Sequence, residues 1–272
     1  MSELRAPAVA GTFYPGRPAE LSAAVAGYLA DAAPPESGET RPDPKAIIVP
    51  HAGYVYSAPV AAAAYARLEP LAGTVTRVVL LGPAHTVYLS AIAVPHVAAF
   101  DGPLGVLTID RPAIWQLAGL PQVVQDDRPH AREHALEVQF PFLQAVLGEV
   151  AILPLVVGEV APAAVGEVIE RLWGGPETLL LVSTDLSHYH PYAAAKRRDA
   201  ATAEAIEAFD GARIGPEDAC GCRALAGLLA AARARGCAIE RLDLRTSGDT
   251  AGHLPPGRDQ VVGYGAWALY EG

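Results

Sequence analysis

Short apolar runs recur along the chain and predict buried β-strands. Some are apolar at almost every position, as in RVVLLG and TLLLVS, and one longer run, AIERLDLR, alternates apolar and charged residues. The runs lie at 46–50, 77–82, 91–95, 150–158, 178–183, 238–245 and 260–270. Continuous apolar strands are typical of a sheet with both faces covered by helices, whereas a half-exposed strand alternates apolar and polar residues.

The segments between these runs carry the periodicity of helices. In residues 19–32, for example, Leu21, Val25 and Leu29 recur every four positions and form one apolar face. Similar patterns predict helices at 58–71, 133–147, 162–174, 193–210 and 222–236. Pro141 is expected to kink or interrupt the helix at 133–147, because proline lacks the amide hydrogen that a helix interior needs. The polar, proline-rich stretch 31–44 is expected to be a surface loop.

Strand and helix patterns alternate to the end of the chain. This order predicts an α/β fold, formed by a single domain over residues 1–272, in which helices cover both faces of a largely parallel or mixed sheet. A chain of 272 residues with 51% hydrophobic residues can bury a large core.

Charge and cysteine content narrow the class of protein. The formal net charge of −10 argues against general binding of nucleic acid, whose phosphates repel an acidic surface. Three cysteines are too few for a disulfide framework, so Cys220, Cys222 and Cys237 are expected to be buried thiols in a reducing compartment. The sequence has no signal-peptide pattern and no run of 18 apolar residues, and we therefore expect a cytoplasmic protein that does not enter membranes.

Histidines and an aspartate follow three of the predicted strands. His51 comes after the strand at 46–50, His85 after 77–82, and Asp185 and His188 after 178–183. A single histidine at such a place more often bonds a backbone carbonyl than a metal. Three of them favour a common cleft, because ligands of open α/β sheets bind at the carboxyl ends of the strands. Imidazoles that meet a carboxylate there form a transition-metal site.

Other polar groups give weaker signals. His134 and Glu137 lie three residues apart in a predicted helix and would share one face, so both could meet a metal or each other. His96 and His130 have no such context and are expected at the surface, while the sequence does not decide the places of His190 and His253. A Ser-His-Asp hydrolase is not favoured, because the sequence has no G-x-S-x-G elbow. A metal-dependent hydrolase is less favoured, because no H-E-x-x-H pair is present.

A set of longer motifs resembles one protein family. The motifs are AVAGTFYPG (8–16), VPHAGYVYSAPVAAAAY (49–65), LLGPAHT (80–86), EHALEVQFPFL (133–143), STDLSHY (183–189), CG (220–221), TSGD (246–249) and VVGYGA (261–266). In this order, over nearly the whole chain, they resemble the Memo family, whose prokaryotic members are called AmmeMemoRadiSam system protein B. The resemblance implies a fold similar to class III extradiol dioxygenases of the LigB type, which open catechol rings with non-haem Fe(II).

The resemblance also implies roles for several residues. His51 and His85 match the family's metal ligands, and His188, with Asp185 beside it, matches the acid/base histidine of the dioxygenases. Animal members complete the metal site with a cysteine, where this chain has Thr250. The third ligand would then be Asp249, Glu133 or Glu137.

Two functions remain open from the sequence. One is a redox protein that uses Fe(II) or copper, with Tyr54, Tyr189, Glu133 and His134 on the substrate side of the cleft. The other is a non-catalytic scaffold for a peptide or small aromatic ligand, with Tyr14, Tyr54 and Tyr189 lining its pocket. The family name associates the scaffold with AMMECR-domain and radical SAM proteins as partners.

Overall fold

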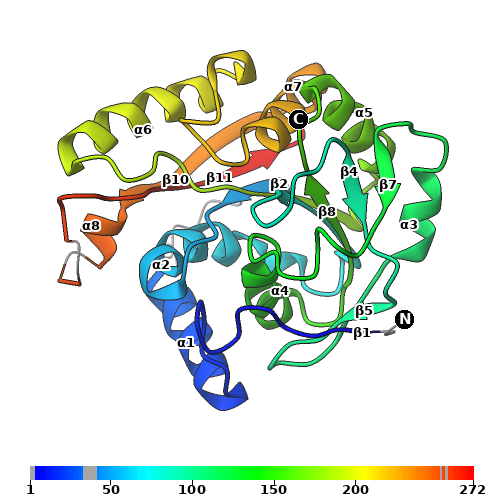
Figure 1. Ribbon diagram of the computed structural model, residues 1–272, viewed down its shortest axis with the longest axis horizontal. Coiled ribbons are helices and arrows are strands. Elements are labelled where there is room, and N and C mark those ends of the chain that lie inside the picture. The colour runs from blue at the N-terminus through cyan, green and yellow to red at the C-terminus, as the bar shows by residue number, and fades with distance from the viewer. Residues whose placement is uncertain (1–3, 33–41, 252, 255–256) are drawn as a thin grey trace.

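A mixed eight-stranded sheet forms the middle of the molecule, with strand order β10-β11-β2-β9-β3-β8-β4-β7 (Figure 1). The computed structural model describes residues 4–32, 42–251, 253–254 and 257–272. The four central strands are parallel: β2 (Pro44–Val49), β9 (Thr178–Ser183), β3 (Arg77–Pro83) and β8 (Ala151–Val157). On one side follow β11 (Gly263–Tyr270), antiparallel to β2, and β10 (Ala238–Thr246), antiparallel to β11. On the other side follow β4 (Ile92–Val94), antiparallel to β8, and β7 (Val123–Gln125), parallel to β4. A small sheet holds β1 (Leu4–Arg5), β5 (Ala99–Phe100) and β6 (Leu107–Thr108).

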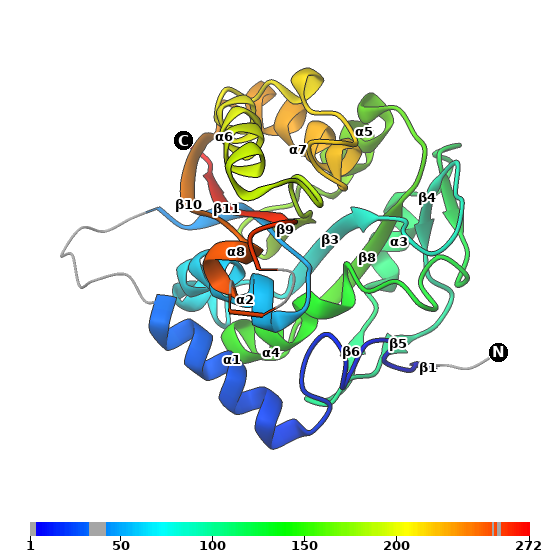
Figure 2. The same cartoon turned by 60° about the vertical axis from the view of Figure 1, so that its left-hand side comes forward.

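Helices cover both faces of the large sheet (Figure 2). One face carries α1 (Pro18–Ala32), α2 (Tyr54–Tyr65), the 3-10 helix η1 (Ala66–Leu71) and α4 (Phe140–Leu147). The other carries α3 (Arg111–Gln116), α5 (Pro162–Leu172), α6 (Tyr192–Glu207) and α7 (Cys222–Ala234). Short elements complete the described chain: η2 (Glu137–Gln139), η3 (Gly211–Arg213) and α8 (Ser247–Thr250). None of the helices in the described residues is long and apolar enough to cross a lipid bilayer.

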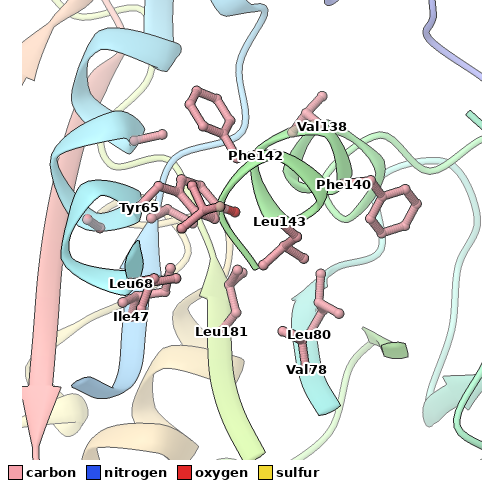
Figure 3. Close-up of a cluster of buried hydrophobic side chains, with 14 of the residues drawn as sticks. Ile47, Tyr65, Leu68, Val78, Leu80, Val138, Phe140, Phe142, Leu143 and Leu181 are labelled. Atoms are coloured by element: carbon pink, nitrogen blue, oxygen red, sulfur yellow. The ribbon is translucent and has the colours of Figure 1, made fainter. Parts of the chain in front are cut away.

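The continuous apolar runs are explained by two cores, one on each face of the sheet. Successive strand residues point to opposite faces, so Ile47 packs in the core under α2 and α4 while its neighbour Ile48 packs in the core under α5 and α7. Figure 3 shows the first core, where Leu80 and Leu181 of the sheet meet Leu143 of α4. Each fully buried aliphatic side chain contributes about 1.5–3 kcal/mol, and these strands offer one to each core at nearly every step.

The predicted α/β fold is confirmed, and all of the predicted strands are present. The sequence pattern missed the short strands β1, β5, β6 and β7, which are two or three residues long and have too few positions to show a period. The loop expected at 31–44 lies largely in residues 33–41, outside the described part of the chain.

Two predicted helices begin elsewhere. The helix expected at 58–71 begins earlier, at Tyr54, and becomes a 3-10 helix at Ala66. The helix expected at 133–147 begins only at Phe140, and Pro141 lies in its first turn, where its missing amide hydrogen costs nothing. Residues 133 and 134 are therefore irregular, and the prediction that His134 and Glu137 share a helix face was wrong.

Candidate metal centre

Three neighbouring strands deliver the predicted histidines to one edge of the sheet. The strands β2, β9 and β3 are adjacent and parallel, so their carboxyl ends lie side by side. His51 follows β2 by two residues, His85 follows β3 by two, and Asp185 follows β9 by two. The chain leaves the sheet at each of these points, and its next side chains face a shared space, as expected for a parallel α/β sheet.

A third histidine joins His51 and His85 at this place. One ring nitrogen from each of His51, His85 and His134 lies within 4.8 Å of the other two, an arrangement that could hold a metal ion. The rings of His85 and His134 stack with centroids 4.6 Å apart, and the ring of His51 stands edge-on to both. With metal–nitrogen bonds of about 2.1 Å, two ligand nitrogens lie at most about 4.2 Å apart. Small side-chain movements would therefore bring all three onto one ion, and the residues fit such an ion.

One buried carboxylate orients the ring of His85 and lies close to that of His134. Glu133 Oε1 accepts a hydrogen bond from His85 Nδ1 at 2.8 Å and lies 3.4 Å from His134 Nδ1. Its other oxygen accepts from the backbone amide of His85 at 2.7 Å, and Oε1 also accepts from the amide of Ala135. Because its Nδ1 is bonded to Glu133, His85 has Nε2 to offer to an ion. Carboxylates commonly fix metal-binding histidines in this way.

His51 is the most deeply buried of the three ligands, with 2% of its surface exposed. Its backbone amide donates to Asp185 Oδ1 at 2.7 Å, which ties the end of β2 to the end of β9. Its Nδ1 lies 2.9 Å from Ser183 Oγ, and its Nε2 lies 3.3 Å from Cys220 Sγ. Cys220 is half-buried and does not belong to the group of three nitrogens.

The surroundings keep the rings of His51 and His134 neutral near pH 7. Burial lowers the pKa of His51 well below its usual value, and repulsion from His85, His134 and His188 lowers it further. Burial likewise lowers the pKa of His134. Burial alone would raise the pKa of Glu133, but its hydrogen bonds with His85 and Ala135 outweigh that effect and lower it, so the carboxylate is ionised. Neutral imidazoles have a free lone pair, which a metal ion requires.

The histidines line a cleft of about 500 Å³. Its polar wall includes Asp185 and His188, both predicted from the sequence. Burial raises the pKa of Asp185 to about 7, although hydrogen bonds from the backbone of His51 and Ala52 oppose the shift. Burial lowers the pKa of His188. The remaining wall is largely aromatic and comes from Phe13, Tyr56, Tyr189 and Tyr264, with Ser247, Gln260 and Val262.

Comparison with known proteins identifies the family of this chain. A family profile described as "Memo-like protein" matches residues 5–268. The chain belongs to the Memo-like family. A MEMO1 family protein of Methanopyrus kandleri is 36% identical over 288 residues, which cover 98% of this chain and 99% of that protein. One from Sulfolobus acidocaldarius is 34% identical and covers 96% of this chain and 97% of its own length. The solved structure of an uncharacterised protein from Escherichia coli K12 aligns with a TM-score of 0.49 at 12% identity, over 81% of this chain and 98% of that chain.

This Memo-like protein uses several of the predicted site residues differently. Tyr54 is buried, and its hydroxyl donates to the carbonyl of Val138 at 2.8 Å instead of facing the cleft. Tyr14 is also buried, with its hydroxyl 2.7 Å from Glu137 Oε1. Glu133 lies behind His85, whose ring it orients, and does not line the cleft. Of the residues expected on the substrate side, Tyr189 and His134 do line it.

Of the three carboxylates expected as a third ligand, Glu133 lies against Nδ1 of His85, and the other two are engaged elsewhere. Asp249 Oδ1 accepts from the hydroxyl of Tyr192 at 2.5 Å, and its Oδ2 closes a capping box with Thr246 at the start of α8. Lys196 Nζ lies 3.6 Å from the same carboxylate. Glu137 binds Arg5 in a buried ion pair. The structure brings neither carboxylate to the three histidines, and His134 stands in the place that the sequence left open.

The Memo-like chain also places His130 differently from the prediction of a surface residue. This histidine is 2% exposed, and its Nε2 lies 3.1 Å from the carbonyl of Ala93, to which it donates as the neutral ring. Burial lowers its pKa to about 4. His96 is exposed, as expected, His190 is half-buried and His253 is exposed. The expectation of three buried thiols holds for Cys222 and Cys237, whereas Cys220 is half-buried.

Several lining residues were not singled out from the sequence. Phe13, Tyr56 and Tyr264 lie in or beside the quoted family motifs, but nothing in their local pattern separates a cleft residue from a core aromatic. Tyr54 and Tyr56 illustrate the difficulty, because they are two residues apart at the start of α2 and only Tyr56 faces the cleft.

Proposed function

We propose that this Memo-like protein binds one transition-metal ion, Fe(II) or copper, through Nε2 of His51, His85 and His134 and uses it for redox chemistry on a small molecule in the cleft. One observation carries the proposal: nitrogens of three imidazoles lie within 4.8 Å of one another, two of them just beyond the carboxyl ends of β2 and β3 and the third from the irregular segment before η2. Imidazole ligands suit iron and copper, and the surrounding residues already hold the three rings. The family resemblance favours redox chemistry over hydrolysis.

The bound ion would supply a redox-active, Lewis-acidic centre at the base of the cleft. The protein's own groups would bind the substrate and move protons around it. Asp185, with a pKa of about 7, can hold or release a proton at neutral pH, and His188 as a neutral imidazole can accept one. The aromatic side chains of Phe13, Tyr56 and Tyr264 give the substrate a largely apolar wall, which favours a small aromatic molecule.

Anaerobic titration of the metal-free protein with Fe(II), and separately with Cu(I) under reducing conditions, tests the metal site. We expect one ion per chain for the wild type, and weakened binding for His51→Ala, His85→Ala and His134→Ala. His96→Ala is the matched control, because His96 is exposed and lies outside the group of three. Unchanged stoichiometry and affinity in all three ligand variants would remove this site from the proposal.

Oxygen uptake in the presence of Fe(II) and a catechol tests the redox part separately. Uptake that depends on the metal and disappears in His188→Ala, with metal affinity retained, supports an acid/base role for His188. Metal binding without uptake for any catechol would leave the metal site and refute dioxygenase-like turnover of that substrate class.

A binding role is the second candidate, and one observation favours it. Tyr189 at the rim of the cleft is 69% exposed and has a φ of +59°, a conformation that non-glycine residues adopt mainly where structure or function requires it. Such an aromatic could hold a peptide or small aromatic ligand, in a complex with AMMECR-domain and radical SAM proteins. The test is whether a purified AMMECR-domain protein or radical SAM protein binds the wild type in a pull-down assay. Binding to the wild type but not to Tyr189→Ala would support this role.

A further inference from the structure

We propose that Ser183, supported by Gln139, is a positioning residue that keeps the proton of the His51 ring on Nδ1 and so leaves Nε2 free for a metal ion. The inference deepens the proposed metal site and rests on it. Neutral imidazole carries its proton on either nitrogen, and only the unprotonated one can bind a metal. Glu133 settles this choice for His85 by accepting from its Nδ1, but no carboxylate touches Nδ1 of His51 in the described residues; Ser183 lies there instead.

The protons around Ser183 can be assigned from its partners. Its Oγ lies 2.6 Å from the carbonyl oxygen of Ala135, which can only accept, so the single hydroxyl proton of Ser183 is donated there. The same Oγ lies 2.9 Å from His51 Nδ1. Since Ser183 has no second proton, it must accept in this contact, and His51 must donate from Nδ1.

Gln139 fixes the serine in this role. Its Nε2 donates to the carbonyl of Pro50 and to Ser183 Oγ, both at 2.9 Å, while its Oε1 accepts from the hydroxyl of Tyr65 at 2.8 Å. Rotating the amide by half a turn would place two acceptors, Oε1 and the Pro50 carbonyl, against each other. Ser183, Gln139 and Tyr65 are all buried, so water does not compete for these bonds.

Cys220 is the available partner for the other tautomer of His51, in which Nε2 carries the proton. Its Sγ lies 3.3 Å from His51 Nε2 and could accept a proton from that nitrogen. Sulfur is a weaker acceptor than a hydroxyl oxygen. The tautomer that donates from Nδ1 to Ser183 is therefore favoured while the serine hydroxyl is present. Without that hydroxyl, a proton on Nδ1 would be buried without a partner, and the ring would be expected to move its proton to Nε2, facing Cys220. Nε2 of His51 would then carry a proton and could not bind the metal ion.

Nitrogen-15 NMR of histidine-labelled, metal-free protein reports the tautomer directly. We expect His51 to carry its proton on Nδ1 in the wild type and on Nε2 in Ser183→Ala. In Fe(II) titrations, Ser183→Ala should bind about 10- to 100-fold more weakly, the usual effect of removing a residue that orients a metal ligand. Thr202→Val is the matched control, because it also removes a buried hydroxyl, here one bonded to the carbonyl of Arg198, and should change neither reading.

The tautomer reading separates this inference from the proposed metal site. A wild-type His51 with its proton on Nε2 overturns the inference, and it does so even if Ser183→Ala does not fold. An unchanged tautomer and unchanged metal affinity in a folded Ser183→Ala protein also overturn it. If the wild type binds no metal at all, the proposed function fails, and the NMR comparison of wild type with Ser183→Ala still decides whether Ser183 sets the tautomer.

Discussion

Replacing Glu133 by glutamine tests how the metal centre is assembled, because it keeps the size of the side chain and removes one acceptor. In the wild type, Oε2 accepts from the backbone amide of His85 at 2.7 Å, and Oε1 accepts from His85 Nδ1 at 2.8 Å and from the amide of Ala135 at 2.9 Å. All of these partners are donors. Whichever way the glutamine amide turns, its NH2 group faces a donor and at least one buried hydrogen bond is lost.

The size of the effect follows from the contacts. A buried donor without a partner costs about 1–3 kcal/mol of folding free energy. The larger functional effect is on the metal, because His85 loses the carboxylate that orients its Nδ1 and His134 loses a negative charge 3.4 Å from its own Nδ1. Loss of such an orienting residue commonly weakens metal binding about 10- to 100-fold. At 1.36 kcal/mol for each factor of ten, this corresponds to about 1.4–2.7 kcal/mol of binding free energy.

The assay is a competition titration of Co(II) or Fe(II) against a chelator of known affinity, combined with urea unfolding. Glu137→Gln is the matched control, because it makes the same change at a buried glutamate that binds Arg5 instead of the histidines. The control should lower the free energy of unfolding without a comparable loss of metal affinity. A Glu133→Gln protein that unfolds at a lower urea concentration but binds metal as tightly as the wild type would refute the orienting role of this carboxylate.

Further predictions concern stability. Burial lowers the pKa of His130 from 6.5 to about 4, so between these pH values the unfolded chain binds a proton that the folded chain does not, and stability falls as the pH falls. The free energy of unfolding of the wild type, minus that of His130→Gln, should drop by roughly 3 kcal/mol from pH 6.5 to pH 4 in urea titrations, and a flat difference would contradict this. Arg5→Met leaves Glu137 buried without its cation and should lower the free energy of unfolding by about 3–5 kcal/mol. A decrease of only about 0–1 kcal/mol, the usual contribution of a solvent-exposed ion pair, would contradict this prediction. In Gly263→Ala the added Cβ would lie 2.1 Å from a buried carboxylate oxygen, which should prevent the native packing, whereas Gly27→Ala in α1, with no atom within 4 Å, should raise the free energy of unfolding by about 0.5–1 kcal/mol.

The fold could be predicted from the sequence because its signals are local and repeated. A run such as 178–183 has an apolar residue at most positions, and a short run of this kind is typical of a strand buried on both faces. The same reasoning placed His51 and His85 correctly, since a residue just beyond a parallel strand must lie at the carboxyl edge of the sheet. The helix at 133–147 failed because apolar spacing does not mark where a helix begins, and Pro141 set that point.

The site was harder to predict because its remaining members come from irregular segments. His134 reaches the cluster from residues without regular structure, so no period of the sequence indicates its direction. Ser183 and Gln139 look like ordinary strand and helix residues in the sequence, and only their contacts with His51, Ala135 and Pro50 reveal what they do.

The sequence by itself therefore determined the α/β fold, the edge of the sheet at which the polar site lies, and the positions of His51 and His85 at that edge. Each of these depends on the spacing of residues along one segment. Only the tertiary structure decided the third histidine, the carboxylate that orients the ring of His85, and which tyrosines face the cleft. These features depend on distances between segments that can be more than 100 residues apart in the chain, as His51 and Ser183 are. Such distances are set by how the two cores pack and not by any local pattern.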